Sequence, residues 1–230
     1  MVSSAVVFDL DGVLIDSEPV WQQVRHQVVT EYGGTWVAEA DRRVMGMNTA
    51  EWSSYLVDEL GVRLSPAELA DVVIAGMVGA YRHGGLPLID GAPEVVHDLA
   101  GAGFPLAVAS SSPPQIIEAA VAGLGLAGLF AALVSSDDVG RGTPAPAVYL
   151  TAAERLGTSP ADCAAVEDSP NGIRAALAAG LAVVAIPNPP PGTEADVPDG
   201  VPVLRRLAEV TPALVATLRP LGDAGPSRRP

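Results

Sequence analysis

The feature that most constrains the fold is an apolar run that ends in two aspartates one residue apart. Residues 5–8 are all apolar, and Asp9, Leu10, Asp11 and Gly12 follow them. Side chains two residues apart on a strand point to the same side, so both carboxylates can flank one reacting atom, and Gly12 allows a sharp turn. The pattern predicts a strand whose end carries a nucleophile and a proton donor. A plain turn after an edge strand is the alternative interpretation.

Further apolar runs alternate with helical patterns from Leu86 onward, which is typical of βαβ units that build a parallel sheet. Strands are predicted at residues 5–9, 105–109, 131–135, 163–167 and 181–186. Helices are predicted at residues 92–102, 114–123, 145–156, 170–179 and 204–218. The expected fold class is therefore α/β, with a Rossmann-like doubly wound parallel sheet.

The segment 17–85 differs, because it shows helical periodicity without a convincing buried strand. Val20, Val24 and Val28, for example, recur at intervals of one helical turn. We expect four helices inserted between the first two core strands, acting as a cap that closes over substrate or as a rigid subdomain. The expected domains are a core of residues 1–16 and 86–221, a helical cap of residues 17–85 and a disordered tail of residues 222–230.

Three later segments follow the first aspartates in a fixed order. Residues 106–112 form an apolar run that ends in three serines, residues 140–146 form a Gly- and Pro-rich loop, and residues 166–169 hold two acids after an apolar run. Together with residues 9–12 they resemble the four motifs of the haloacid dehalogenase superfamily. The resemblance is to its capped sugar-phosphate phosphatases and β-phosphoglucomutase-like enzymes, and it covers about residues 5–215.

The motif residues fall at or just beyond predicted strand ends. In doubly wound sheets, ligands bind beyond the carboxyl ends of the strands. The residues that should gather at one edge are Asp9, Ser110, Thr143, Glu167 and Asp168. Phosphoryl transfer needs an in-line nucleophile, charge compensation and a proton for the departing oxygen. We assign Asp9 as the nucleophile that forms an aspartyl-phosphate. Asp11 would protonate the leaving alcohol and then deprotonate water.

Magnesium is the expected cofactor. An Asp9 carboxylate oxygen, the backbone carbonyl of Asp11 and the Asp168 side chain would hold it, with water and phosphate completing the coordination. The resemblance implies that Glu167 acts mainly beside the metal rather than on it. The alternative to metal binding is that Glu167 and Asp168 are solvated residues of a turn, although both follow an apolar run.

The serines of the second motif are candidates for phosphate binding. Ser110, with the backbone amides of Ser111 and Ser112, would donate hydrogen bonds to phosphate oxygens at the start of the following helix. Serines before Pro113 are also ordinary helix N-caps, and both roles can hold at once.

The third motif departs from the family pattern. The resemblance implies a lysine before Pro144, but Thr143 stands there, and all basic residues of the chain are arginines. Losing such a preorganised group typically costs roughly 2.7 to 4 kcal/mol. Arg141 lies at most about 7 Å of chain away, and we expect its long side chain to reach the phosphate. If Arg141 is instead a solvated loop residue, the protein would be slow or inactive.

The cap positions bear on which phosphoester is used. Mutase-like members carry a cap histidine and a cap arginine, where this chain has Trp21 and Thr49. Without those groups, release of phosphate to water is more credible than its return to a bisphosphate intermediate. Trp21, Met47 and Asn48 are candidate substrate-facing residues, and packing inside the cap is at least as credible for Trp52.

The sequence thus predicts a Mg²⁺-dependent phosphatase acting on a small phosphomonoester, such as a sugar or polyol phosphate. The alternatives are a β-phosphoglucomutase-like mutase and a phosphometabolite-binding protein that has lost turnover through Thr143. A net charge of −14 disfavours nucleic acid and anionic membranes as partners. Without a recognisable export signal, the cytoplasm is the expected location. The resemblance implies a monomer.

Overall fold

The computed structural model describes residues 3–84, 86–187 and 196–221. Its core is one five-stranded sheet in the order β3-β2-β1-β4-β5, with every neighbouring pair parallel. The strands are β1 (Ala5–Phe8), β2 (Leu106–Ser110), β3 (Phe130–Ser135), β4 (Cys163–Glu167) and β5 (Ala182–Ala185). The predicted α/β doubly wound sheet is confirmed.

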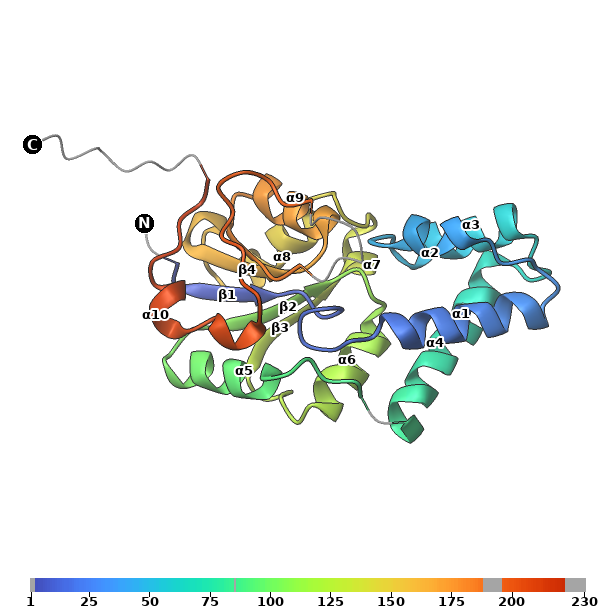
Figure 1. Ribbon diagram of the computed structural model, residues 1–230, viewed down its shortest axis with the longest axis horizontal. Coiled ribbons are helices and arrows are strands. Elements are labelled where there is room, and N and C mark those ends of the chain that lie inside the picture. Colours follow the sequence, from blue (N-terminus) through green and yellow to red (C-terminus); the bar gives the residue numbers. More distant parts are fainter. Residues whose placement is uncertain (1–2, 85, 188–195, 222–230) are drawn as a thin grey trace, which may run out of the picture.

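Helices cover both faces of this sheet (Figure 1). Strands β1 and β4 are therefore buried along their whole length. Val6 and Phe8 belong to the apolar cluster on one face, whereas Ala5 and Val7 belong to the cluster on the other. The first face packs against α5 (Ala92–Gly101), α6 (Pro114–Gly123) and α10 (Pro212–Val215), and the second against α8 (Ala147–Arg155) and α9 (Pro170–Ala178). The short helix α7 (Ser136–Val139) directly follows β3.

Four helices between β1 and α5 form a lobe beside the sheet, which we call the four-helix lobe (Figure 1). They are α1 (Glu18–Glu31), α2 (Ala38–Val44), α3 (Thr49–Leu60) and α4 (Pro66–Gly84). Helix α3 starts at a capping box formed by Asn48 and Glu51 and ends at Gly61, which has a φ of 74°. The number of helices matches the sequence prediction. The expected domain division remains a prediction, and the tail 222–230 lies outside the described residues.

The prediction of one last helix over residues 204–218 is wrong. The structure has a short 3₁₀ turn at Leu207–Glu209 and a separate α10. Pro212 explains the break, since proline lacks the N–H needed inside a helix and clashes with the preceding turn. Thr211 instead caps α10 by accepting a hydrogen bond from the Leu214 amide.

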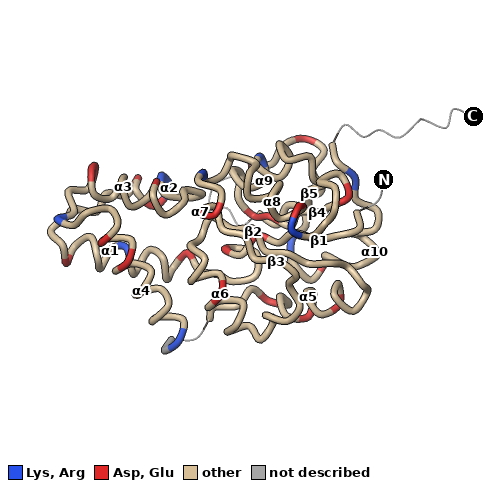
Figure 2. Tube along the Cα trace, turned by 180° about the vertical axis from the view of Figure 1, so that it is seen from behind, with Lys and Arg blue, Asp and Glu red and all other residues tan. Residues whose placement is uncertain are grey.

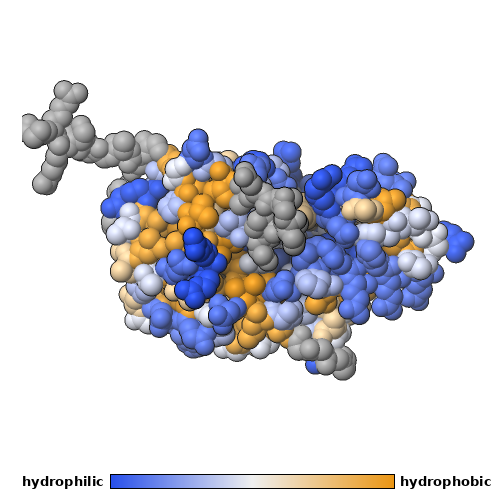
Figure 3. All heavy atoms as spheres, in the orientation of Figure 1, coloured by the Kyte–Doolittle hydropathy of each residue, from blue (hydrophilic) through white to orange (hydrophobic). Residues whose placement is uncertain are grey.

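Surface character differs between the two lobes. Acidic positions outnumber basic ones across the molecule (Figure 2). On the face in Figure 3, apolar residues gather over the sheet, whereas the four-helix lobe is mainly hydrophilic. No helix in the described part of the chain combines the length and apolar character that crossing a membrane requires.

Candidate active site

Three acids meet where β1 and β4 end. The Asp9 amide donates a hydrogen bond of 3.0 Å to the Val166 carbonyl, which continues the pairing of β1 with β4 by one residue. Carboxylate oxygens of Asp9, Glu167 and Asp168 lie within 4.8 Å of one another, a spacing that suits ligands of one metal ion. The structure therefore brings together the acids that the sequence assigned to the metal site.

Two glycines let backbone approach this cluster closely. A Cβ on Gly12 would lie 2.0 Å from Oδ2 of Asp168, and its φ of 81° disfavours other residues as well. A Cβ on Gly172 would lie 1.6 Å from Oε1 of Glu167. Both acids are thus packed against backbone that only glycine can supply.

Burial raises the pKa of all three acids, and the charges of neighbouring acids raise it further for Asp9 and Asp168. For Asp9 the largest cause is burial, followed by the charges of Glu167 and Asp168. Burial and the charge of Glu167 likewise raise the pKa of Asp168. A divalent cation among these oxygens would relieve the repulsion, so the donor set fits a hard ion such as Mg²⁺.

Glu167 differs from the other two acids in its hydrogen bonds. The Tyr149 hydroxyl donates a 2.6 Å hydrogen bond to Oε1, and the Ser169 amide donates one of 3.0 Å to Oε2. Only 2% of Glu167 is exposed, and burial raises its pKa. Both carboxylate oxygens are therefore already engaged, which agrees with the expected place beside the metal.

Asp11 lies in a very different environment from Asp9. Its Oδ1 accepts hydrogen bonds from the Ser17 hydroxyl and, at 3.3 Å, from the Trp21 indole. Its Oδ2 accepts them from the hydroxyls of Ser110 at 3.1 Å and Ser112 at 2.7 Å. The second motif and the first turn of the four-helix lobe together hold the carboxylate that was assigned as the acid/base.

Two predicted phosphate-binding residues contact the four-helix lobe. The hydroxyls of Ser111 and Thr143 donate hydrogen bonds of 3.1 Å and 3.4 Å to the Gly46 carbonyl. A Cβ on Gly46 would lie only 2.4 Å from the Thr143 hydroxyl oxygen. The loop between α2 and α3 is thus seated directly on the second and third motifs.

The start of α3 makes a second contact with the sheet lobe. Thr49 donates two hydrogen bonds to Asp137 of α7, from its amide at 2.8 Å and its hydroxyl at 2.6 Å. The Gly142 amide donates a longer one, of 3.5 Å, to Glu51. The position that carries an arginine in mutase-like proteins is therefore occupied here by a contact between the lobes.

The remaining predicted residues form no hydrogen bond or ion pair with the three acids in the described part of the chain. Arg141 is exposed and, among the described residues, makes no hydrogen bond or ion pair, so its expected reach to phosphate stays a prediction. Asn48 is buried and accepts a hydrogen bond from the Glu51 amide as the N-cap of α3. Met47 is half-buried, and Trp52 is buried against Trp21 with ring centroids 6.3 Å apart.

Sequence reasoning missed several side chains that contact the site. The hydroxyls of Ser17, Ser112 and Tyr149 donate hydrogen bonds to the predicted catalytic and metal-binding acids. Asp137 accepts a hydrogen bond from the Thr49 amide. Ser112 adjoins the predicted pair of serines, so the serine run itself was a usable signal. A tyrosine on a later helix gives no comparable signal.

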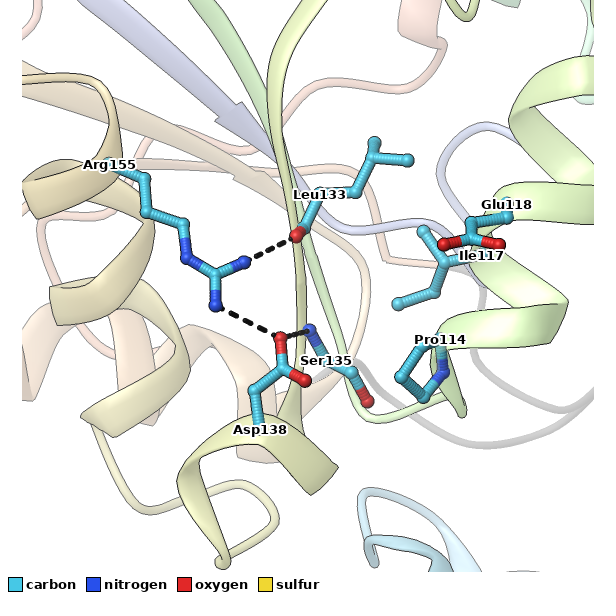
Figure 4. Close-up of a pocket in the computed structure, with 7 residues that line it drawn as sticks. All are labelled: Pro114, Ile117, Glu118, Leu133, Ser135, Asp138 and Arg155. Atoms are coloured by element: carbon cyan, nitrogen blue, oxygen red, sulfur yellow. Dashed lines mark hydrogen bonds and ion pairs between the residues drawn. The ribbon is translucent and has the colours of Figure 1, made fainter.

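A small pocket on the sheet lobe is separate from this site (Figure 4). It lies between α6, β3, α7 and α8, and none of the predicted site residues lines it. Its arginine, Arg155, is already bound to the Leu133 carbonyl at 2.8 Å and to Asp138 at 3.2 Å. We assign this pocket no part in the chemistry.

The chain is similar in sequence to several proteins that are named as phosphatases. The chain is 35% identical over 189 residues to a probable pseudouridine-5′-phosphatase of Drosophila melanogaster, covering 80% of this chain and 81% of that protein. It is 32% identical over 185 residues to the fructose-1-phosphate phosphatase YqaB of Escherichia coli, covering 79% and 95%. Against the bifunctional riboflavin kinase/FMN phosphatase of Arabidopsis thaliana, identity is 31% over 193 residues, and the match spans 50% of that protein.

The fold has a close counterpart among solved structures. A variant of CbbY from Rhodobacter sphaeroides, crystallised with xylulose 1,5-bisphosphate, superposes with a TM-score of 0.83 at 24% identity, covering 95% of this chain and 100% of that one. The model of haloacid dehalogenase-like hydrolases matches residues 4–180. The match includes all four motifs and most of the sheet, and so the chain belongs to the haloacid dehalogenase-like hydrolases.

Proposed function

We propose that this protein is a Mg²⁺-dependent phosphatase that hydrolyses a small sugar or polyol phosphate through an aspartyl-phosphate intermediate. One observation carries the proposal: two aspartates from one strand end have opposite surroundings. Asp9 lies among acids within metal-sharing distance, whereas Asp11 accepts hydrogen bonds from four donors. A nucleophile and an acid/base need such different environments.

The metal site of this proposal consists of Asp9, Asp168 and the Asp11 backbone carbonyl, with Glu167 beside it. Carboxylate oxygens of Asp9, Asp168 and Glu167 already lie within 4.8 Å of one another. When bound, Mg²⁺ would neutralise charge on the phosphate oxygens and lower the repulsion between phosphate and carboxylate. This local attraction is needed because the whole chain carries a net charge of −14.

The protein's own groups carry out the bond changes. A carboxylate oxygen of Asp9 attacks phosphorus while the bond from phosphorus to the leaving oxygen breaks. Protonated Asp11 gives its proton to that oxygen, and the alcohol departs. Water then attacks the aspartyl-phosphate, Asp11 takes a proton from it, and the acyl-phosphate P–O bond breaks to release inorganic phosphate and free Asp9.

The donors around Asp11 are compatible with this cycle. Hydroxyl groups both donate and accept hydrogen bonds, so Ser17, Ser110 and Ser112 can contact Asp11 whether it is ionised or protonated. The Trp21 indole only donates, and its hydrogen bond therefore goes to an oxygen that carries no proton. Trp21 would thus direct the transferable proton toward the other oxygen of Asp11.

The names of the relatives support the proposed substrate class. Fructose-1-phosphate phosphatase and pseudouridine-5′-phosphatase are named for small phosphorylated sugars or nucleosides. We propose a substrate of that size for this chain, rather than nucleic acid or a membrane surface. The proposal keeps the expected cytoplasmic location and monomeric state.

Hydrolysis is favoured over mutase chemistry by two contacts. Trp21 donates to Asp11, and Thr49 donates twice to Asp137. Neither position supplies the basic group that mutase-like proteins carry there. The alternative of a protein without turnover depends on Thr143, which provides a hydroxyl but no charge.

The test is Mg²⁺-dependent release of inorganic phosphate from p-nitrophenyl phosphate and from a panel of sugar and polyol phosphates. We expect turnover that stops with EDTA and returns with Mg²⁺, and that is absent in Asp9→Asn. Production of a phosphosugar isomer instead of inorganic phosphate would favour the mutase. Tight binding of panel members without turnover would favour a binding protein.

A further inference from the structure

Arg25 is the one basic side chain buried within the described part of the chain. It lies on α1, one turn after Trp21, and only 8% of it is exposed. Its guanidinium carbon lies 4.2 Å from the centroid of the Trp21 ring and 5.7 Å from that of Trp52. The two indoles therefore fix a positive charge inside the four-helix lobe.

Nearby acids act on this charge, but none of them pairs with it directly. Among the described residues, Arg25 makes no hydrogen bond or ion pair, and its Nε is buried without a partner. Nearby acids already have other donors: Glu18 accepts a 3.1 Å hydrogen bond from Gln22, and Asp41 accepts one of 3.4 Å from the Trp36 indole. The guanidinium thus has donors available for a group that is not part of the protein.

Keeping an unpaired guanidinium buried is costly. Burial lowers the pKa of Arg25 to about 10, so the group is still charged at neutral pH. Stacking on tryptophan returns only about 0.5 to 2 kcal/mol, whereas a buried charge without a partner costs several. Such a residue is expected where a ligand completes its hydrogen bonds.

The position of Arg25 places it on the leaving-group side of the site. The indole that carries the guanidinium also donates to Asp11, which protonates the leaving oxygen in the proposed mechanism. The charge of Asp11 acts directly on Arg25. The donors of Arg25 therefore suit the alcohol portion of the substrate rather than the phosphate.

We propose that Arg25 is a specificity-determining residue that donates hydrogen bonds to hydroxyl groups of a neutral polyol or sugar leaving group. This inference rests on the proposed phosphatase function. A neutral group fits better than an anionic one, because Glu18, Asp11 and Asp41 all act on Arg25 as negative charges and would repel a carboxylate. Glu18, two turns before Arg25 on α1, offers an acceptor for the same hydroxyls.

The experiment compares three phosphoesters of equal chain length. Sorbitol 6-phosphate carries neutral hydroxyls, n-hexyl phosphate carries none, and 6-phosphogluconate carries hydroxyls and a carboxylate. We expect Arg25→Met to lower kcat/KM for sorbitol 6-phosphate by roughly 10- to 100-fold, the effect of losing hydrogen bonds from a charged group. Turnover of n-hexyl phosphate should change by less than about threefold, within the effect of an uninvolved residue.

Control variants separate this role from a structural one. Arg42→Gln removes a positive charge from an exposed position of the same lobe and should leave all three substrates unaffected. Arg25→Gln replaces Arg25→Met if the latter does not fold. Equal losses for sorbitol 6-phosphate and n-hexyl phosphate, or no selective loss, would overturn the proposal. So would an Arg25-dependent preference for 6-phosphogluconate.

Binding measurements keep the result independent of turnover. Calorimetry in the Asp9→Asn background gives the affinities of the same three compounds without hydrolysis. A selective loss of affinity for sorbitol 6-phosphate on adding Arg25→Met supports the role of Arg25 even if the wild-type protein proves inactive. Equal affinities with and without Arg25 reject it even if the protein is an active phosphatase.

Discussion

Asp9 and Asp11 leave the same strand two residues apart, yet their surroundings are opposite. Asp9 faces two other acids within 4.8 Å, and burial and repulsion raise its pKa. Asp11 is held by three hydroxyls and an indole. One side of the strand end therefore gathers negative charge that a cation would offset, and the other side supplies hydrogen-bond donors from the protein itself.

In the proposed mechanism, this difference gives the two aspartates of one short motif two chemical roles. The acids around Asp9 come from β4, whereas the donors around Asp11 come from the second motif and from the start of α1. The metal side is thus built entirely by the sheet lobe. The leaving-group side depends on contact between the two lobes.

The largest expected effects come from replacing the two aspartates separately. Asp9→Asn should lower turnover of every substrate by about 10⁴-fold or more, since no nucleophile remains. Asp11→Asn should lower turnover of sugar phosphates by roughly 10²- to 10⁴-fold, the usual contribution of an acid/base. Its effect on p-nitrophenyl phosphate should be smaller, because nitrophenolate leaves readily without a proton. The measurement is kcat for both substrate types.

A matched variant guards against general disruption of the site. Asp162→Asn changes an aspartate at the far end of β4 and should leave both substrate types unaffected. Equal losses in Asp11→Asn for activated and unactivated esters would contradict the assignment of Asp11 as the proton donor. The two carboxylates would then have different environments, but Asp11 would not be the proton donor.

The third motif provides the next largest effect. If Arg141 supplies the positive charge missing at Thr143, Arg141→Ala should lower kcat by roughly 10²- to 10³-fold, as for the loss of one preorganised donor. Adding Thr143→Lys should restore much of that loss. Arg42→Ala, which removes an exposed arginine of α2, is the matched control. Unchanged turnover in Arg141→Ala would mean that the metal side works without any basic side chain at this loop.

Stability should depend on pH and metal through the acid cluster. The folded pKa values of Asp9, Glu167 and Asp168 are raised, so the folded state binds more protons than the unfolded state. In EDTA, stability should therefore fall as pH rises from about 4 toward the raised folded values. Each unit of difference removes about 1.4 kcal/mol per group.

Thermal unfolding across that pH range, with and without Mg²⁺, measures this effect. Mg²⁺ should raise Tm most at the upper end, where the carboxylates are ionised. Asp168→Asn should flatten the EDTA profile and weaken the response to Mg²⁺. A Tm that rises with pH in EDTA would show that other groups outweigh the cluster.

The metal side was more predictable from the sequence than the leaving-group side. Asp9 and Asp168 follow apolar runs, and parallel strands bring such positions to one edge, so their meeting follows from the alternation of strands and helices. Two of the four donors to Asp11, Ser17 and Trp21, instead depend on how the lobes dock. Trp21 and Ser17 lie on an amphipathic segment, and no periodicity reveals that this face turns toward the strand end.

We expect the smallest effect from removing the hydrogen bond between the lobes that the Trp21 indole donates to Asp11. Trp21→Phe keeps an aromatic ring against Arg25 but removes the indole N–H. The loss of one hydrogen bond to a carboxylate should lower kcat for sugar phosphates by roughly tenfold. The measurement is kcat and KM, with kcat changing more if Trp21 orients the proton of Asp11.

Trp52→Phe is the matched control, because Trp52 is 1% exposed and packs on Trp21 without a hydrogen bond to Asp11, and phenylalanine keeps a ring near Arg25. It should reduce stability, since buried aromatic area is lost, while turnover at low temperature stays within about threefold. If both variants lower kcat equally, packing within the four-helix lobe, rather than the indole hydrogen bond, sets the position of Asp11. The leaving-group side would then depend on the rigidity of that lobe as a whole.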